Sequence, residues 1–183
     1  IWKKDEFKKT NTIANYRHAI IGYLVGDIVY RRMQEVKELN QSAFKSAYVY
    51  DYQISDIDMY YLFSTSLRQN SINEGIEDAL TFAEQVKRYG FLDSELELAK
   101  KRQIDHLKQA LIEENTRTSE DFIEEYIDHF IYEEMISGLQ KEIEYSENIL
   151  SSISVEDLND YFNNHFEETN RIISIRAPDF INN

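Results

Sequence analysis

Cysteine is absent from the 183-residue chain, and proline occurs only once. Without cysteine the chain has no disulfide and no thiolate metal site, and the redox state of its compartment stays open. Only five glycines are present, and none belongs to a Gly-x-Gly phosphate-binding loop. No apolar run approaches the roughly 18–20 residues of a membrane span. These absences exclude several common kinds of site.

Positive charge is scarce, because 20 Lys and Arg stand against 34 Asp and Glu, for a net charge of −14. Binding of nucleic acid requires clustered Lys and Arg, so a nucleic-acid partner is not expected. An anionic membrane surface is disfavoured for the same reason. Hydrophobic residues make up 42% and aromatic residues 13%, which favours a folded core over disorder. The length fits one domain.

The beginning of the chain has neither an initiating Met nor a signal-peptide pattern; it starts Ile1-Trp2-Lys3-Lys4. We interpret the chain as a piece of a longer protein, truncated at its N-terminal side. Targeting signals of that longer protein therefore cannot be judged from this sequence.

Two strong helical patterns meet at Gly90, near the middle of the chain. Apolar residues recur at three- and four-residue spacing on both sides of it; they are Ile72, Ile76, Ala79, Leu80, Ala83 and Val86 before it, and Leu96, Ala99, Ile104, Leu107 and Leu111 after it. Glycine takes a left-handed conformation without a Cβ penalty, so Gly90 is expected to close the first helix. Phe91 is expected to make the apolar contact that stabilises the turn, and Asp93 or Ser94 is expected to cap the second helix.

Strands are predicted by strict alternation in 46–54 and 59–67, which read as an antiparallel hairpin. A further strand is expected at 170–176, in the same sheet. The whole order is a polar lead-in at 1–10, a helix at 11–39, the strand hairpin at 46–67, helices within 72–166 and a closing strand at 170–177. This order predicts an α+β fold, an antiparallel sheet with several helices packed on one face.

One predicted helix begins at Thr118 or Ser119 and carries a wide apolar stripe, formed by Phe122, Ile123, Tyr126, Ile127, Phe130 and Ile131. Ser154 and Asp157 have the spacing of a capping box for the last helix. In the first helix, Gly22 and Gly26 lie four residues apart, which suggests a close approach of another part of the chain.

Catalytic and metal-binding residues are not evident. The four histidines, His18, His106, His129 and His165, belong to no zinc-binding motif. Glu125, His129 and Glu133 follow one another at four-residue spacing, which permits a metal in principle. An ordinary solvated helix face with a Glu–His pair is the better interpretation. His18 is expected to be solvated or to act as a helix cap.

The phrase Gly90-Phe91-x-x-x-Glu95-Leu96-x-x-Ala99-Lys100 resembles a helical corner in the non-catalytic domains of pitrilysin/insulinase-type zinc metallopeptidases (the inverzincins), bacterial long-chain type. The resemblance extends in order along nearly the whole chain, through 24–35, 46–67, 134–139, 152–159 and 170–178. Leu92 departs from the family's threonine, and Met135 and Ser137 replace two prolines of a later turn.

The resemblance implies a partial insulinase-like metallohydrolase domain, residues 1–183, and most closely a second, non-catalytic domain. The parent would be a zinc-dependent endopeptidase that hydrolyses peptides in an enclosed chamber, whose zinc lies on a His-x-x-Glu-His helix outside this chain. No catalytic, cofactor-binding or metal-binding residue is assigned here, and the chain itself is predicted to be inactive. Its expected partners are the remaining domains of the same chain and, in the parent, a peptide substrate.

Two alternatives stay open: an acidic helical protein-interaction module, and a domain of an inactive peptidase homologue. The compartment is not determined, although the bacterial periplasm or cell envelope is favoured over the cytoplasm.

Overall fold

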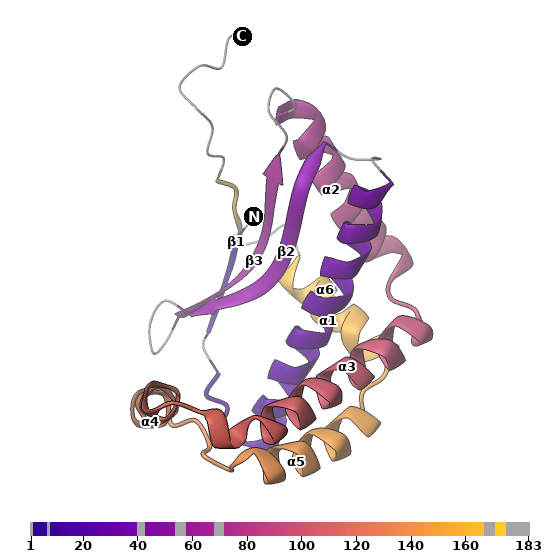
Figure 1. Cartoon of the computed structure of the whole chain (residues 1–183). Coiled ribbons are helices and arrows are strands. Elements are labelled where there is room, and N and C mark those ends of the chain that lie inside the picture. Colours follow the sequence, from indigo (N-terminus) through magenta and orange to yellow (C-terminus); the bar gives the residue numbers. More distant parts are fainter. Residues whose placement is uncertain are drawn as a thin grey trace.

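Helix α1 (Ile13–Glu38) is the longest element, and the remaining elements are arranged around it (Figure 1). The computed structural model describes residues 2–6, 8–39, 43–53, 58–67, 72–166 and 171–174. The other elements are β1 (Trp2–Glu6), β2 (Phe44–Gln53), β3 (Asp58–Leu67), α2 (Ile72–Tyr89), α3 (Asp93–Ile112), the 3-10 turn η1 (Glu114–Thr116), α4 (Ser119–Tyr132), α5 (Leu139–Ser151), α6 (Val155–His165) and β4 (Arg171–Ile172).

Helix α1 begins where Thr12 caps it, since the Thr12 hydroxyl accepts a hydrogen bond from the Asn15 amide at 3.2 Å. Its buried residues recur at helical spacing; they are Ile20, Ile21, Leu24, Val25, Ile28, Val29 and Met33. Gly26 lies directly against β2, because a Cβ built on it would sit 2.8 Å from the Val49 carbonyl oxygen. The predicted close approach is thus confirmed at Gly26, which faces the sheet.

The strands form one sheet in the order β2-β3-β1-β4, with every neighbouring pair antiparallel. The predicted hairpin is confirmed, and its register runs from Ser46 opposite Ser66 to Gln53 opposite Met59. Residues 54–57 of the predicted turn lie outside the described residues. The closing strand is confirmed at Arg171–Ile172, where it pairs with β1, but is wrong at Ile173 and Ser174, which are not in a strand. Residues 170 and 175–177 are not described.

The predicted polar lead-in at 1–10 is wrong at Trp2–Glu6, which form strand β1 between β3 and β4. Its sequence, WKKDE, has no clear alternation of apolar and polar residues. The extended conformation is stabilised by ladders to two strands distant in sequence, at Trp2 opposite Leu62 and opposite Ile172. Local periodicity carries no information about such pairing.

The predicted fold class also requires correction, because the domain is mostly helical: six α-helices account for most of the described residues. Helix α1 packs on β2, and α2 contacts the hairpin, but α3 packs on α1 and α5 instead of on the sheet. An α+β layer with several helices on one face of a sheet is therefore the wrong description. Hydrophobic spacing identified the apolar face of each helix without indicating what that face packs against.

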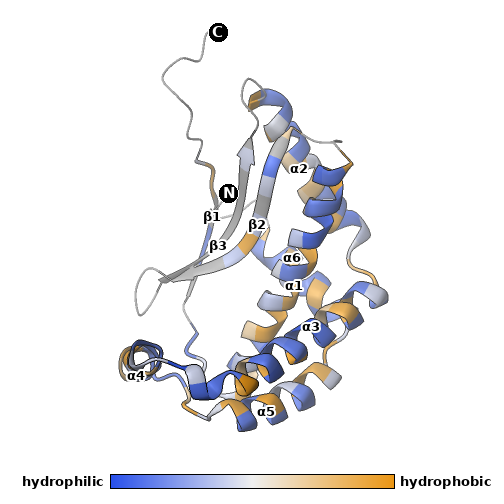
Figure 2. Ribbon diagram, viewed as in Figure 1, coloured by the Kyte–Doolittle hydropathy of each residue, from blue (hydrophilic) through white to orange (hydrophobic). Residues whose placement is uncertain are grey.

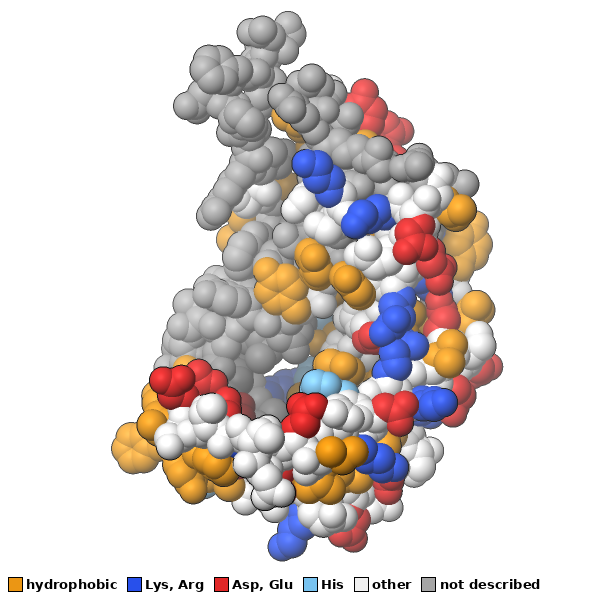
Figure 3. Space-filling model, in the orientation of Figure 1, with side chains coloured by type: hydrophobic (Ala, Val, Ile, Leu, Met, Phe, Trp, Pro, Cys, Tyr) orange, Lys and Arg blue, Asp and Glu red, His pale blue; other side chains and the backbone are white. Residues whose placement is uncertain are grey.

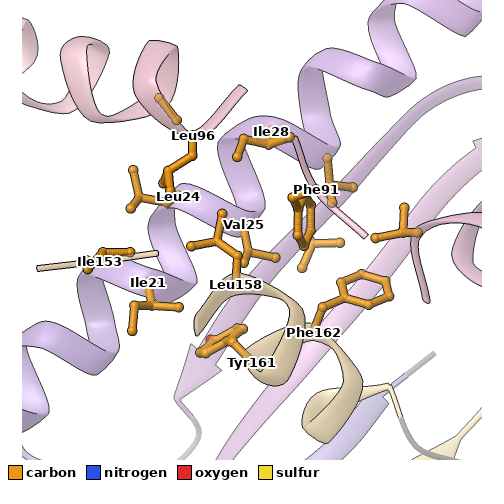
Figure 4. Close-up of a cluster of buried hydrophobic side chains, with 14 of the residues drawn as sticks. Ile21, Leu24, Val25, Ile28, Phe91, Leu96, Ile153, Leu158, Tyr161 and Phe162 are labelled. Atoms are coloured by element: carbon orange, nitrogen blue, oxygen red, sulfur yellow. The ribbon is translucent and has the colours of Figure 1, made fainter. Parts of the chain in front are cut away.

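The core lies between α1, the α2–α3 corner and α6 (Figure 4). Leu24 and Val25 of α1 and Leu158 of α6 are fully buried, and Phe91 meets Phe162 edge-on with 6.0 Å between ring centroids. Hydrophobic and hydrophilic residues alternate in bands along α3 and α5, as expected for helices with one face in the core (Figure 2). No helix in the described ranges is both long and apolar enough to cross a bilayer.

Candidate functional site

The corner between α2 and α3 has the predicted left-handed glycine. Gly90 has a φ of +66°, and its amide donates to the Val86 carbonyl at 2.8 Å. The next amide, of Phe91, donates to Oδ1 of Asn159 on α6 at 3.1 Å. The same Oδ1 would lie 2.5 Å from a Cβ at position 90. The corner is therefore closed both by its own backbone and by a side chain from the last helix.

Arg32 of α1 joins the corner to the long helix. Its guanidinium donates to both carboxylate oxygens of Glu95 at 2.6 Å and to the Gly90 carbonyl at 2.9 Å. It also lies 5.2 Å from the centroid of the Phe91 ring, within range of a cation–π contact. A bidentate pair of this kind constrains both distance and orientation.

Glu95 also provides the cap of α3, since its Oε2 accepts from the Leu92 amide at 2.8 Å. The prediction that Asp93 or Ser94 caps this helix is wrong, because α3 begins at Asp93 with Leu92 as its N-cap. Burial alone raises the pKa of Glu95, but the hydrogen bonds from Arg32 and from the Leu92 amide, with the Arg32 charge, outweigh it and lower that pKa.

A second arginine joins the other end of α1 to α6. Arg17 Nη2 donates to Asp157 Oδ2 at 2.7 Å, and Asp157 Oδ2 accepts from the Ser154 amide at 2.9 Å. The predicted capping box at Ser154 and Asp157 is confirmed. Burial raises the pKa of Asp157, but Arg17 and Ser154 together lower it. Asp27 likewise pairs with Arg31 and with Arg102 of α3.

The Glu125–His129–Glu133 series does not converge on a common point. Glu125 pairs with Arg117 at 2.7 Å, and Glu133 ends α4 in a left-handed conformation and pairs with Lys9 at 2.6 Å. His129 Nδ1 lies 2.5 Å from the Glu134 carbonyl oxygen. The expected Glu–His pair is replaced by separate partners. Within the ranges described, no group of three His, Asp or Glu is placed to hold a metal ion.

Of the remaining histidines, His18 and His165 lie together with Tyr161 between α1 and α6. The His18 ring centroid is 5.1 Å from that of Tyr161 and 5.8 Å from that of His165. His165 is buried, with Nδ1 at 2.7 Å from the Tyr161 carbonyl oxygen. His18 is half-buried and packs in this aromatic group, and its expected solvated or capping role stays a prediction; His106 is exposed.

Helix α4 differs from the other helices because none of its residues is buried. Its predicted apolar stripe is present but faces outward, from 39% exposure at Phe122 to 87% at Phe130. Five of these side chains line a shallow groove of about 250 Å³, namely Ile123, Tyr126, Ile127, Phe130 and Ile131. In the space-filling view, hydrophobic side chains gather over α4 at the lower left, beside acidic ones (Figure 3).

Sequence reasoning missed Arg17, Arg32 and Asn159, which connect α1, the corner and α6. Their only signal in the sequence was a charged or polar side chain on an amphipathic helix, which does not distinguish them from solvent-exposed residues. The arrangement connects helices to one another through hydrogen bonds and ion pairs. The described residues thus offer a rigid frame with an exposed apolar helix.

No protein-family model and no curated protein sequence matches the chain. Solved structures do match. The periplasmic protease PqqL from Escherichia coli superposes with a TM-score of 0.84 at 12% identity, over 89% of this chain and 18% of that one. A predicted insulinase family protease from Yersinia pestis gives 0.71 at 10% identity, over 90% and 36%. An inactive peptidase domain from Bordetella parapertussis gives 0.54 at 11% identity, over 93% and 87%.

Proposed function

We propose that this chain is a non-catalytic domain of an insulinase-type zinc metalloendopeptidase and forms part of the wall of its substrate chamber. The chain is structurally similar to domains of bacterial insulinase-family proteases over most of its length. The main support for the proposal is the length of the match: this chain corresponds to 18% of the PqqL chain, the share expected of one domain in a longer enzyme. The domain assignment of residues 1–183 remains part of this proposal.

The role proposed for this chain is structural: it keeps part of the chamber wall in a fixed shape. Arg32, with Glu95 and the Gly90 carbonyl, and Arg17, with Asp157, hold the corner and α6 to α1. Zinc and the residues that activate water would belong to another domain of the polypeptide, as the family resemblance implies. A rigid wall keeps an enclosed chamber in the shape that orients an extended peptide toward the metal. The peptide substrate and the other domains are the proposed partners.

A second candidate is a domain of an inactive homologue, favoured by the similarity to an inactive peptidase domain. The two are separated by the sequence upstream of residue 1. A His-x-x-Glu-His helix within about one domain length supports the active enzyme. Its absence, together with no hydrolysis by the longer polypeptide, supports the inactive homologue.

A periplasmic location is proposed because the matching Escherichia coli protease is periplasmic. Cell fractionation with an antibody against this chain tests it. Recovery of the protein with cytoplasmic markers would contradict the proposed location and leave the fold assignment unaffected.

The proposed function is tested on the longer polypeptide by measuring zinc content and hydrolysis of an unstructured peptide. Gly90→Val distorts the corner, so we expect lower hydrolysis at unchanged zinc content. Glu144→Gln, an exposed position on α5, is the control and should leave both unchanged. If Gly90→Val leaves hydrolysis unchanged while the melting temperature falls, the domain has no part in shaping the chamber.

A further inference from the structure

We propose that the apolar face of α4 docks into an apolar groove with a basic rim on another domain of the same polypeptide. The face is defined by Phe122, Ile123, Tyr126, Ile127, Phe130 and Ile131. This inference rests on the proposed function only in requiring a longer polypeptide. It does not require that the polypeptide be active.

The composition of this face is that of a buried helix surface. Its residues fall at i, i+1, i+4, i+5, i+8 and i+9, which is a stripe wide enough for a core-facing helix. Nevertheless Ile123, Tyr126, Ile127 and Ile131 are each about half exposed or more, at 54%, 59%, 47% and 50%. Met135 and Ile136, which follow the helix in sequence, are also exposed, at 43% and 42%. A contiguous exposed patch of this kind marks an interaction surface.

Helix α4 is capped at both ends but has no buried residue, and of the contacts at its ends only the one at the C-terminus reaches another segment of the chain. At the N-terminus, the Thr118 amide donates to Asp121 at 2.6 Å, and the Arg117 guanidinium lies 4.3 Å from the Phe122 ring centroid. At the C-terminus, Glu133 pairs with Lys9 from the segment before α1. A 14-residue helix is marginal in water on its own. The local contacts stabilise the helical conformation itself, and a helix that is already formed loses less entropy on docking.

The shape and charge of this surface indicate what kind of surface can bind it. Although the side chains of this face enclose a shallow hollow, the helix as a whole is convex, so its partner surface is a groove, as in other helix-in-groove contacts. The helix flank is acidic, with Glu120, Asp121 and Glu124 exposed, so the groove requires Lys or Arg at its rim. A second copy of this chain would bring acidic flanks together, and each copy carries a net charge of −14. Self-association through α4 is therefore disfavoured.

A domain of the same polypeptide fits better than a separate protein. The matching proteases are longer, since this chain covers 18% and 36% of two of them. A linked domain is present at an effective concentration in the millimolar range, so a patch of modest size is enough to keep the two surfaces together.

Hydrogen exchange of the α4 amides in this chain and in the longer polypeptide tests the proposal. We expect α4 to exchange at least about tenfold more slowly in the longer polypeptide. The double variant Ile127→Ser/Phe130→Ser should restore fast exchange there and lower the melting temperature of the longer polypeptide. It should not lower that of this chain alone, where both side chains are exposed. Glu120→Gln/Glu124→Gln is the matched control on the acidic flank.

Equal exchange rates in the two proteins would overturn the proposal. Protection that grows with the concentration of this chain alone would indicate a second copy, and protection that requires added peptide would indicate a substrate site; either result overturns it. Zinc content and hydrolysis are measured on the same samples. Protected α4 amides without hydrolysis would contradict the proposed enzyme and support the docking. Hydrolysis with unprotected α4 amides would contradict the docking and support the proposed enzyme.

Discussion

At the scale of single residues, the corner between α2 and α3 depends on the conformation of Gly90 and on the side chains that close around it. Asn159 accepts from the Phe91 amide, and Arg32 donates to the Gly90 carbonyl. Both contacts come from helices far from the corner in sequence. A change at Gly90 should therefore also weaken the contacts of the corner with α1 and α6.

Gly90→Val should destabilise the chain. A β-branched residue at a φ of +66° costs about 1–2 kcal/mol, and displacing Asn159 from the Phe91 amide adds about 1 kcal/mol. A melting temperature lower by about 5–10 °C is expected for a chain of this size. The same change in an Asn159→Ala background should cost less, because the clash at Asn159 Oδ1 is gone. An unchanged melting temperature for Gly90→Val would show that the left-handed conformation is not required.

The lowered pKa of Glu95 makes the stability of the folded chain depend on pH. This pKa is lowered in the folded state from its usual 4.5, so the folded chain binds a proton there less readily than the unfolded chain. The contribution of Glu95 to stability is present above pH 4.5 and is lost as the pH falls through the lowered value. The free energy of unfolding should therefore decrease on acidification below pH 4.5.

Glu95→Gln should weaken this acid dependence and cost about 2 kcal/mol at pH 7, because it removes charged hydrogen bonds from Arg32. Glu144→Gln changes the net charge equally at an exposed position on α5 and serves as the control. Denaturant unfolding at pH 3.5 to 7 measures both variants. If the free energy of unfolding decreases equally below pH 4.5 in Glu95→Gln and in the unmodified chain, the role assigned to Glu95 is contradicted.

At the scale of elements, the contact of α1 with β2 is set by the absence of a side chain at Gly26. A Cβ there would approach the Val49 carbonyl oxygen to 2.8 Å, and a backbone atom cannot move aside without shifting the strand. The helix and the sheet thus approach most closely where α1 has no side chain.

Gly26→Ala separates this packing from local helix propensity, because the two have opposite signs. Propensity alone would stabilise the helix by up to about 1 kcal/mol, whereas the clash with β2 should lower stability by about 1–3 kcal/mol. Thermal or denaturant unfolding of the chain decides between them. A more stable variant would show that α1 and β2 are less closely packed than described.

At the scale of the whole molecule, the chain is a frame without a reaction centre in its described residues. We predict that the 183-residue chain alone holds no stoichiometric zinc and cleaves no peptide, because it has no zinc-binding motif. Elemental analysis after brief chelation, with a peptide-cleavage assay, measures this. About one zinc retained per chain would refute the assignment of the metal to another domain.

Much of the local structure was predictable from the sequence. The left-handed Gly90 and buried Phe91, the start of α4 at Thr118–Ser119, the capping box at Ser154 and the strand hairpin all follow from short-range rules and are confirmed. The cap of α3 was predicted wrongly, because Glu95 is oriented for that role by Arg32 from another helix. A residue with a distant partner is not recognisable from local spacing.

The sequence by itself determined where the helices and the strand hairpin form, because periodicity, caps and glycine conformation depend on neighbours a few residues apart. Only the tertiary structure decided that WKKDE is an inner strand, that α3 packs on other helices and not on the sheet, and that the apolar stripe of α4 stays exposed. The physical reason is that burial is a property of two surfaces. A sequence shows that a face is apolar, but the surface that covers it can come from anywhere in the chain or from beyond it.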